Sequence, residues 1–129
     1  MVNERDVFDC ERGAWTLADR TIHDVEPYGR LSVAEMFAYS SNVGFAKLSS
    51  RIGADRLHEW ARFFGFGRPT RAGIPGEEKG LLKKPGDRFS AATMCFGQGL
   101  GVTVIQLAAA YGADVVRAAR LDSRRASPR

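Results

Sequence analysis

The stretch AYSSNVGFAK (residues 38–47) joins two segments of helical character and decides how the rest of the sequence is interpreted. Ser40, Ser41 and Asn42 lie at its centre. Serine and asparagine compete with the backbone for hydrogen bonds, so they disfavour helix interiors and favour caps and turns. They could simply end one helix and begin the next, or they could form part of a catalytic cleft that a helix junction holds rigidly. The tripeptide alone leaves both interpretations open.

Helical signals flank this stretch on both sides. A capping box at 32–35 predicts a helix that stops at Ser40, and a second helix is expected over about 42–51 with Gly53 as its cap. A third helix is expected from about 54–55. Its apolar residues fall on one stripe, which predicts that they belong to the core: Leu57, Trp60, Ala61 and Phe64.

The remaining segments predict little strand. Short apolar alternations around Gly13 and Asp19 suggest a small hairpin within 6–30. The Gly- and Pro-rich residues 65–89 are expected to form a loop with at most a short strand, followed by a glycine-rich turn at 95–101. A second capping box, Thr103-Val-Ile-Gln, opens a helix expected to run through about residues 110–111. Helix therefore dominates, and the fold is predicted to be mainly α.

Composition limits the classes of function. The 129 residues are 44% hydrophobic and 26% charged, which suits one soluble domain or a piece of a larger one. No apolar run approaches the ~20 residues of a membrane span, and the polar N-terminus does not read as a signal peptide. As written, the chain would be expected to remain cytoplasmic.

Neither the charge distribution nor the cysteine and histidine residues indicate a nucleic-acid interface or a metal site. The net charge of +4 falls within residues 117–129, so the remainder is neutral overall, which argues against a nucleic-acid interface. Cys10 and Cys95 have no metal-ligand spacing and are expected to be small buried hydrophobes. His23 and His58 lack partners at metal spacing and are interpreted as surface or satisfied polar residues.

Two acidic and two basic neighbours lie in the long loop. Glu77-Glu78 is interpreted as solvated rather than as a pair of general acids, and Lys83-Lys84 is interpreted as loop charge.

Several stretches, in unbroken order over about residues 6–111, resemble the transpeptidase domain of class B penicillin-binding proteins. The stretches that carry the resemblance are VFDCERGAW (7–15), RTIHD (20–24), FAYSSNVGFAKLSSRIGADRLHEWARFFGFGRPT (37–70), GIPGEEKGLL (73–82) and CFGQGLGVTVIQLAAAY (95–111). The resemblance implies part of an α/β, β-lactamase-like fold, chiefly its helical subdomain with a small N-terminal hairpin.

Within this resemblance, Ser40-Ser41-Asn42 matches the family's Ser-x-Asn motif, one of three motifs that form the active site. It implies that Ser40 lies in the proton path and that Asn42 orients the substrate by donating its amide hydrogen to a carbonyl. Ser41 takes the variable middle place and is given no role. Gly97-Gln98-Gly99 is interpreted as a turn that shapes the domain.

The other two motifs are not found in the sequence. No serine is followed three residues later by lysine, and neither Lys-Thr-Gly nor Lys-Ser-Gly occurs. Acyl transfer needs a nucleophile with an adjacent base, so the chain is expected to be inactive alone. After residue 111 the resemblance ends, and residues 112–129 are interpreted as a divergent Arg-rich tail, either a product of a frameshift or rearrangement or a solvated tail.

The leading hypothesis is a fragment of a serine D,D-transpeptidase of peptidoglycan synthesis. The resemblance implies a full-length protein anchored in the inner membrane with its catalytic domain outside the cytoplasm, stem peptides as substrate and β-lactams as inhibitors. It also implies that no metal and no cofactor are needed. A role in division or in elongation stays open. The alternative is a non-catalytic peptide- or protein-binding module. The fragment predicts exposed apolar surface, whereas the module predicts that this surface is buried.

Overall fold

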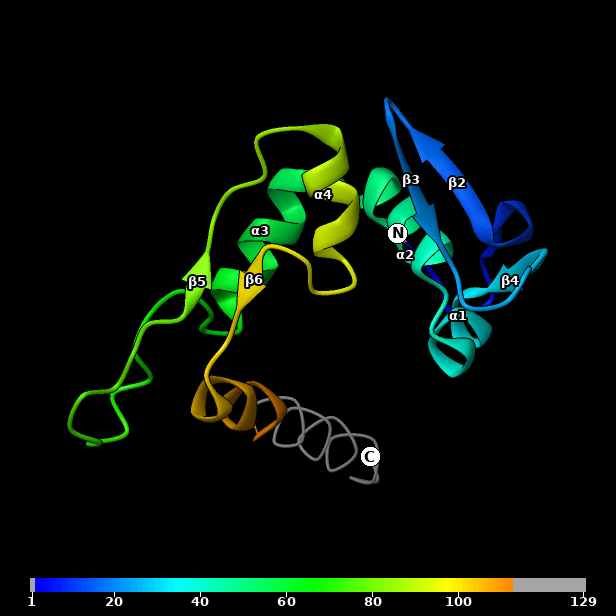
Figure 1. Cartoon of the computed structure of the whole chain (residues 1–129). Coiled ribbons are helices and arrows are strands. Elements are labelled where there is room, and N and C mark those ends of the chain that lie inside the picture. Colours follow the sequence, from blue (N-terminus) through cyan, green and yellow to red (C-terminus); the bar gives the residue numbers. More distant parts are fainter. Residues whose placement is uncertain (1, 113–129) are drawn as a thin grey trace, which may run out of the picture. The chain divides into compact units, whose positions relative to one another are not determined.

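The structure is a computed structural model that describes residues 2–112. It divides into two compact units (Figure 1). Among the described residues, the first unit contains 2–59 and 83–100, and the second contains 60–82 and 101–112. The predicted C-terminal tail falls outside the described residues, apart from residue 112.

The first unit begins with two antiparallel strand pairs. β2 (Ala14–Leu17) and β3 (Arg20–His23) form the predicted hairpin. The second pair, β1 (Val7–Asp9) with β4 (Arg30–Ser32), is not predicted by the sequence pattern. A 3-10 turn, η1 (Glu11–Gly13), links the two pairs.

The predicted helices around the Ser-x-Asn segment are confirmed. α1 (Val33–Tyr39) follows a capping box in which Ser32 Oγ accepts from the Glu35 backbone N–H at 3.2 Å and the Glu35 carboxylate accepts from the Ser32 N–H at 2.8 Å. These bonds, the backbone one foremost, lower the pKa of Glu35. α2 (Asn42–Ile52) follows at once and ends at Gly53, which has φ +91°.

One further helix of the first unit is missing from the sequence prediction. α4 (Arg88–Met94) lies where the sequence pattern predicts the end of a loop, and Asp87 caps it by accepting from the Ser90 N–H at 2.7 Å. α4 packs against α2, where Ser49 Oγ donates to the Ala91 carbonyl at 2.6 Å. The sequence pattern did not predict this short helix because its cap, Asp87, follows directly on Pro85-Gly86, a pair that is typical of loops.

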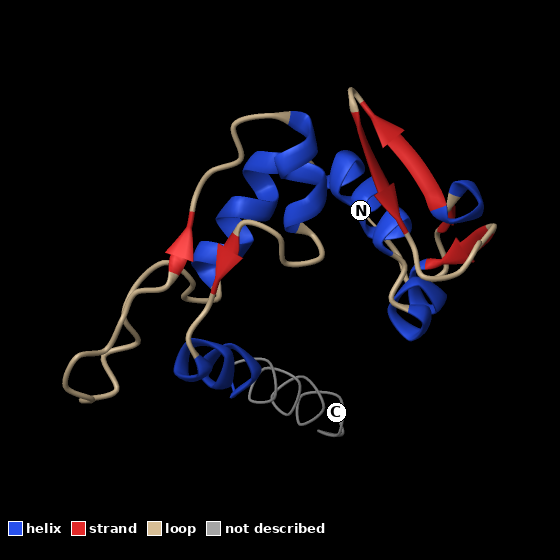
Figure 2. Ribbon diagram, in the orientation of Figure 1, coloured by secondary structure: helices blue, strands red, loops and turns tan. Residues whose placement is uncertain are grey.

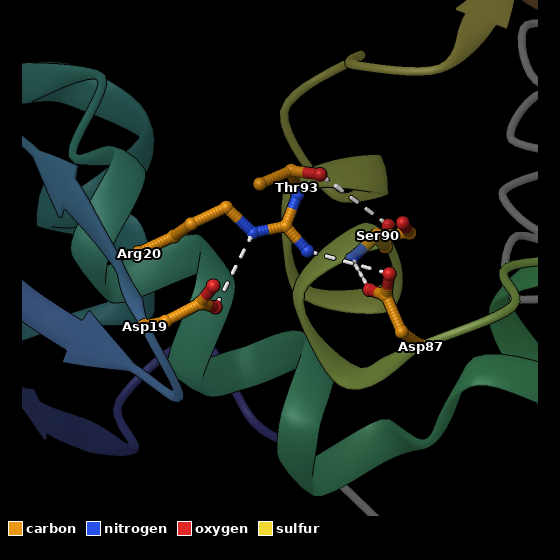
Figure 3. Close-up of polar contacts among 5 residues, drawn as sticks. All are labelled: Asp19, Arg20, Asp87, Ser90 and Thr93. Atoms are coloured by element: carbon orange, nitrogen blue, oxygen red, sulfur yellow. Dashed lines mark hydrogen bonds and ion pairs between the residues drawn. The ribbon is translucent and has the colours of Figure 1, made fainter.

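Figure 3 shows a second link to α4. The Arg20 guanidinium on β3 donates to an Asp87 oxygen at 3.3 Å and lies 3.9 Å from Asp19. It also stacks over the Phe89 ring, 3.9 Å from the ring centre. The same Asp87 carboxylate caps the helix, and its hydrogen bond to the Ser90 backbone is the first cause that lowers its pKa. The hairpin and α4 are therefore joined through one carboxylate.

The hydrophobic core lies in the first unit. Ten apolar side chains are buried, and they come from the strands and from α1, α2 and α4: Cys10, Leu17, Ile22, Leu31, Val33, Met36, Val43, Ala46, Leu48 and Ala92. Cys10 is buried as predicted, whereas Cys95 is half-buried. Figure 1 shows the β2–β3 hairpin beside α2, and these elements are in contact.

The helix α3 (Ala54–Phe63) corrects one expectation. Its apolar stripe was expected to lie in the core, yet no residue of α3 is buried. Trp60 is 50% exposed and Phe63 is 68% exposed, while Leu57 and Phe64 are half-buried. The amphipathic pattern correctly predicts a helix, but in the described chain this helix has little to pack against.

The second unit contains a long loop (Figure 2), which ends at β5 (Leu81–Leu82). β5 pairs with β6 (Leu100–Gly101). Residues 104–112 are helical, as predicted, and Thr103 Oγ1 and Gln106 Oε1 accept from each other's backbone N–H groups at 3.1 and 2.9 Å. None of the described helices is long and apolar enough to cross a membrane.

Candidate active-site segment

Ser40 lies at the junction between α1 and α2 in a left-handed conformation, with φ +55° and ψ +45°. Its backbone N–H donates to carbonyls of the last turn of α1, so the residue closes that helix. The residue is exposed, and no other described residue makes a hydrogen bond to its hydroxyl. The junction therefore presents a free hydroxyl on a fixed backbone.

Ser41 has a structural role that the sequence interpretation did not assign. It is 0% exposed and is the N-cap of α2, where its Oγ accepts from the Gly44 N–H at 3.0 Å. The same hydroxyl donates to Asp24 Oδ2 at 2.7 Å. One buried hydroxyl thus caps the N-terminus of α2 and bonds it to Asp24, the residue that follows β3.

Asn42 is the first residue of α2 and is half-buried. Its Nδ2 donates to the backbone carbonyl of His23 at 3.1 Å. An amide side chain has two N–H donors and one carbonyl acceptor, so one donor and the acceptor are left for another partner. His23 thus contributes to the segment through its backbone rather than through its imidazole.

Close packing surrounds the buried side of the junction. A Cβ added at Gly44 would lie 2.7 Å from the side chain of Met36, which is 0% exposed. Cys10, also 0% exposed, borders the same region, and burial raises the pKa of its thiol while the neighbouring Ser41 side chain opposes that rise. The Ser-x-Asn segment therefore rests on a tightly packed layer.

Lys47 is the lysine of α2, and its ammonium group is paired with a residue outside the Ser-x-Asn segment. Lys47 forms an ion pair with Glu11 and lies 5.5 Å from the centre of the Trp15 ring. Among residues 2–112, no lysine is bonded to Ser40 or Ser41, so no activated nucleophile is assembled. The described chain presents a hydroxyl and an amide, which can pass a proton and orient a substrate.

The remaining predicted features lie outside this segment. Gly97 and Gly99 have φ of +92° and +75°, conformations that favour glycine in the turn after α4. Within residues 2–112, no group of three His, Cys, Asp or Glu side chains is arranged to hold a metal ion.

Glu77 lies in the long loop as expected, and it also accepts hydrogen bonds that the sequence interpretation did not predict. Its carboxylate accepts from the Thr70 hydroxyl and backbone N–H, both at 2.6 Å, and from the Arg71 N–H at 3.0 Å. These bonds, led by the Thr70 hydroxyl, lower the pKa of Glu77. Glu77 therefore organises the loop of the second unit. Lys84 likewise pairs with Asp55 at 2.8 Å, which raises the pKa of the lysine.

Comparison with known proteins identifies the family. Residues 1–115 match the family model of the penicillin binding protein transpeptidase domain. The chain is 42% identical over 102 residues to penicillin-binding protein PbpB of Mycolicibacterium smegmatis, covering 77% of this chain and 15% of that protein. It is 39% identical over 94 residues to the probable peptidoglycan D,D-transpeptidase PenA of Neisseria gonorrhoeae, covering 71% and 16%.

Solved structures agree with these relatives. The transpeptidase domain of penicillin-binding protein 3 from Burkholderia pseudomallei matches with a TM-score of 0.83 and 31% identity, over 87% of this chain and 34% of that chain. The chain thus spans 15–16% of the length of these curated relatives. The resemblance drawn from the motifs is confirmed: the chain belongs to the penicillin-binding protein transpeptidase family and corresponds to part of a class B transpeptidase domain.

Proposed function

We propose that this chain supplies the Ser-x-Asn portion of the active site of a peptidoglycan D,D-transpeptidase that also binds penicillin. The observation that carries the proposal is the match of the chain to this family together with the exposed Ser40 hydroxyl on a fixed helix junction. In the proposed reaction, stem peptides are cross-linked through an acyl-serine intermediate whose nucleophile lies outside this chain. We further propose that residues 6–111 form the transpeptidase portion.

Each residue of the segment has a separate part in this proposal. Ser40 accepts and returns a proton between the acyl-serine centre and the leaving or attacking amine, which suits an exposed hydroxyl that can both donate and accept. Asn42 donates its remaining N–H to a substrate carbonyl, since its other donor is held by the His23 carbonyl. Ser41, which lies between Ser40 and Asn42, fixes the backbone of these two residues through its buried hydrogen bonds.

The exposed aromatic residues support a segment of a larger domain over a self-contained binding module. A module is expected to bury its apolar surface, yet Phe37 is 71% exposed, Tyr39 is 52% exposed and Phe63 is 68% exposed. Large exposed apolar groups of this kind are typical of surfaces that another part of a protein covers.

The proposal is tested first with the 129-residue chain and a fluorescent penicillin, followed by mass spectrometry. No covalent adduct is expected, because no serine has a lysine three residues later. A stable adduct of one ring-opened penicillin on any serine would contradict the proposal.

The second test reads the DNA on both sides of the coding sequence. We expect Ser-x-x-Lys upstream in frame and Lys-Thr-Gly or Lys-Ser-Gly downstream. The longer protein encoded there should react with penicillin, and Ser40→Ala or Asn42→Ala should slow that acylation by about tenfold or more. Absence of both motifs from the flanking DNA, or normal acylation in both variants, counts against the proposal.

A further inference from the structure

Asp24 connects the strand β3 to the Ser-x-Asn segment through both oxygens of its carboxylate. Oδ2 accepts from Ser41 Oγ at 2.7 Å, and Oδ1 accepts from the Val43 backbone N–H at 2.9 Å. The partners lie 17 and 19 residues further along the chain. An ordinary N-cap needs only the Ser41 hydroxyl, so these bonds are an additional, long-range restraint on α2.

Asp24 is itself held in place. Its backbone N–H donates to the Gly13 carbonyl at 2.8 Å, which extends the β2–β3 pairing by one bond. Gly13 has φ +82°, and a Cβ there would lie 2.6 Å from the Glu26 carbonyl oxygen, so the backbone on both sides of this contact is close-packed. The carboxylate therefore starts from a rigid base.

The place of the contact, at the N-terminus of α2, suits a carboxylate as the hydrogen-bond acceptor. The N-terminus of a helix carries a partial positive charge, and α2 is eleven residues long, so a carboxylate at its first turn is stabilised. Hydrogen bonds that an ionised group accepts are shorter and stronger than neutral ones. Because Ser41 is 0% exposed, water does not offer a ready replacement for the Asp24 carboxylate.

We infer that Asp24 is a positioning residue for the proposed transpeptidase reaction, acting through Ser41 and Val43 to fix the places of Ser40 and Asn42. The inference rests on the proposed function and extends it to a residue outside the motif. Asn42 is bonded to the carbonyl of His23, the residue before Asp24, so the end of one strand orients the whole segment. Ser41, the middle serine of the motif, is then the residue through which Asp24 restrains the segment.

The first experiment uses the 129-residue chain and follows backbone amide exchange by NMR in Asp24→Asn. Asparagine has one acceptor oxygen where the carboxylate has two, and its NH2 group cannot accept, so at least one of the two bonds is lost. Exchange at Val43 and Gly44 should therefore rise by about tenfold or more. The Asn42 side-chain amide signals should also shift. Mid-helix amides such as Ala46 and Leu48 should keep their protection, because they are bonded within α2 itself.

Asp19→Asn is the matched control, since it removes one carboxylate from the same hairpin, and Asp19 forms its ion pair with Arg20 rather than with a residue of α2. It should leave exchange at Val43 and Gly44 unchanged. The inference is overturned if Asp24→Asn leaves these amides unchanged, if Asp19→Asn changes them equally, or if Ala46 and Leu48 lose protection in the same proportion. The last result would mean general destabilisation.

The second experiment measures penicillin acylation in the longer protein that the flanking DNA encodes. Asp24→Asn should lower the acylation rate constant at saturating penicillin by about tenfold with little change in the melting midpoint. Adding Ser41→Ala should lower it by less than the two single effects combined, because both act on one contact.

The two hypotheses fail in different ways. If the unmodified longer protein does not react with penicillin, the proposed function is wrong, whereas the exchange result still decides whether Asp24 holds the segment. If that protein reacts and Asp24→Asn reacts at the same rate, the positioning role is wrong while the proposed function stands.

Discussion

The two units of the chain bury different kinds of side chain. All ten buried apolar side chains lie in the first unit. In the second unit, Gln106 is the one side chain among the described residues that is fully buried, at 1% exposure. Its side-chain amide nitrogen, Nε2, donates to the carbonyls of Arg68 and Lys79, both at 2.8 Å. The first unit is thus stabilised mainly by apolar burial and the second mainly by a polar network.

This difference explains how each unit should respond to change. Apolar burial is non-directional, so a core tolerates substitutions that preserve volume and resists those that leave cavities. A buried polar network depends on every partner, because a group left unsatisfied costs more than one bond is worth. The first unit should therefore unfold cooperatively, and the second should loosen when one contact is removed.

The largest effect is expected from Met36→Ala in the first unit. Met36 is 0% exposed, so the substitution should lower the free energy of unfolding by about 2–5 kcal/mol. Met36→Leu keeps the volume and should cost less than about 1.5 kcal/mol. Urea unfolding followed by circular dichroism measures both. Equal losses from the two variants would show that apolar packing does not dominate this unit.

A smaller and more local effect is expected from Gln106→Ala. The substitution removes the donor to two backbone carbonyls, in bonds that are partly buried, and should cost about 1–3 kcal/mol. Exchange of amides in residues 68–80 should rise, while those of α2 should not. Leu107→Ala is the control, because Leu107 is 42% exposed on the same helix. Loss of α2 protection in Gln106→Ala would show that the units do not respond separately.

Acid should act on the second unit through Glu77. The pKa of this group is lowered in the folded chain, so its contribution to stability is complete above the ordinary glutamate pKa and is lost as the pH falls through the lowered value. Exchange of the Thr70 and Arg71 amides, corrected for intrinsic pH dependence, should rise over that range. Glu77→Gln should remove the pH dependence, and Glu78→Gln should not. A pH dependence that survives in Glu77→Gln would assign the effect to another group.

The smallest effect on stability is expected at the exposed aromatic residues of α3. Trp60→Ser and Phe63→Ser should change the free energy of unfolding by no more than about 0.5 kcal/mol each, since both side chains are at least half exposed. Binding of a hydrophobic fluorescent dye to the native chain should fall, whereas the exposed Arg62→Ser should leave it unchanged. A large loss of stability in either aromatic variant would mean that α3 packs more closely than its exposure indicates.

Local signals in the sequence predicted most of the helices. The capping boxes at 32–35 and 103–106 form as expected because all their partners lie within four residues. The β1–β4 pair was missed because three-residue strands joined across some twenty residues have no local pattern. The apolar stripe of α3 predicted the helix correctly but predicted burial wrongly. An amphipathic pattern shows which face of a helix can pack, but it does not show whether another part of the chain covers that face.

The candidate site shows the same limit. Ser40 and Asn42 were found because they belong to a motif that is contiguous in the sequence. The contribution of Asp24 could not be derived, because its partners lie 17 and 19 residues away and only the folded hairpin brings them together. Ser41 was given no role because it occupies the variable place, yet its burial makes it the contact between the two segments.

The position of α4 in the sequence has a consequence for synthesis on the ribosome. Residues 83–100 complete the first unit only after the second unit's residues 60–82 have been made. At about 5–20 residues per second, the interval between residues 59 and 100 lasts roughly 2–8 s. Until then the surface of α2 that packs against α4 is uncovered, and Ser49 has no Ala91 carbonyl to bond. Termination within this interval would release a chain that contains the whole Ser-x-Asn segment but has an open core, and chaperones would be expected to bind it there.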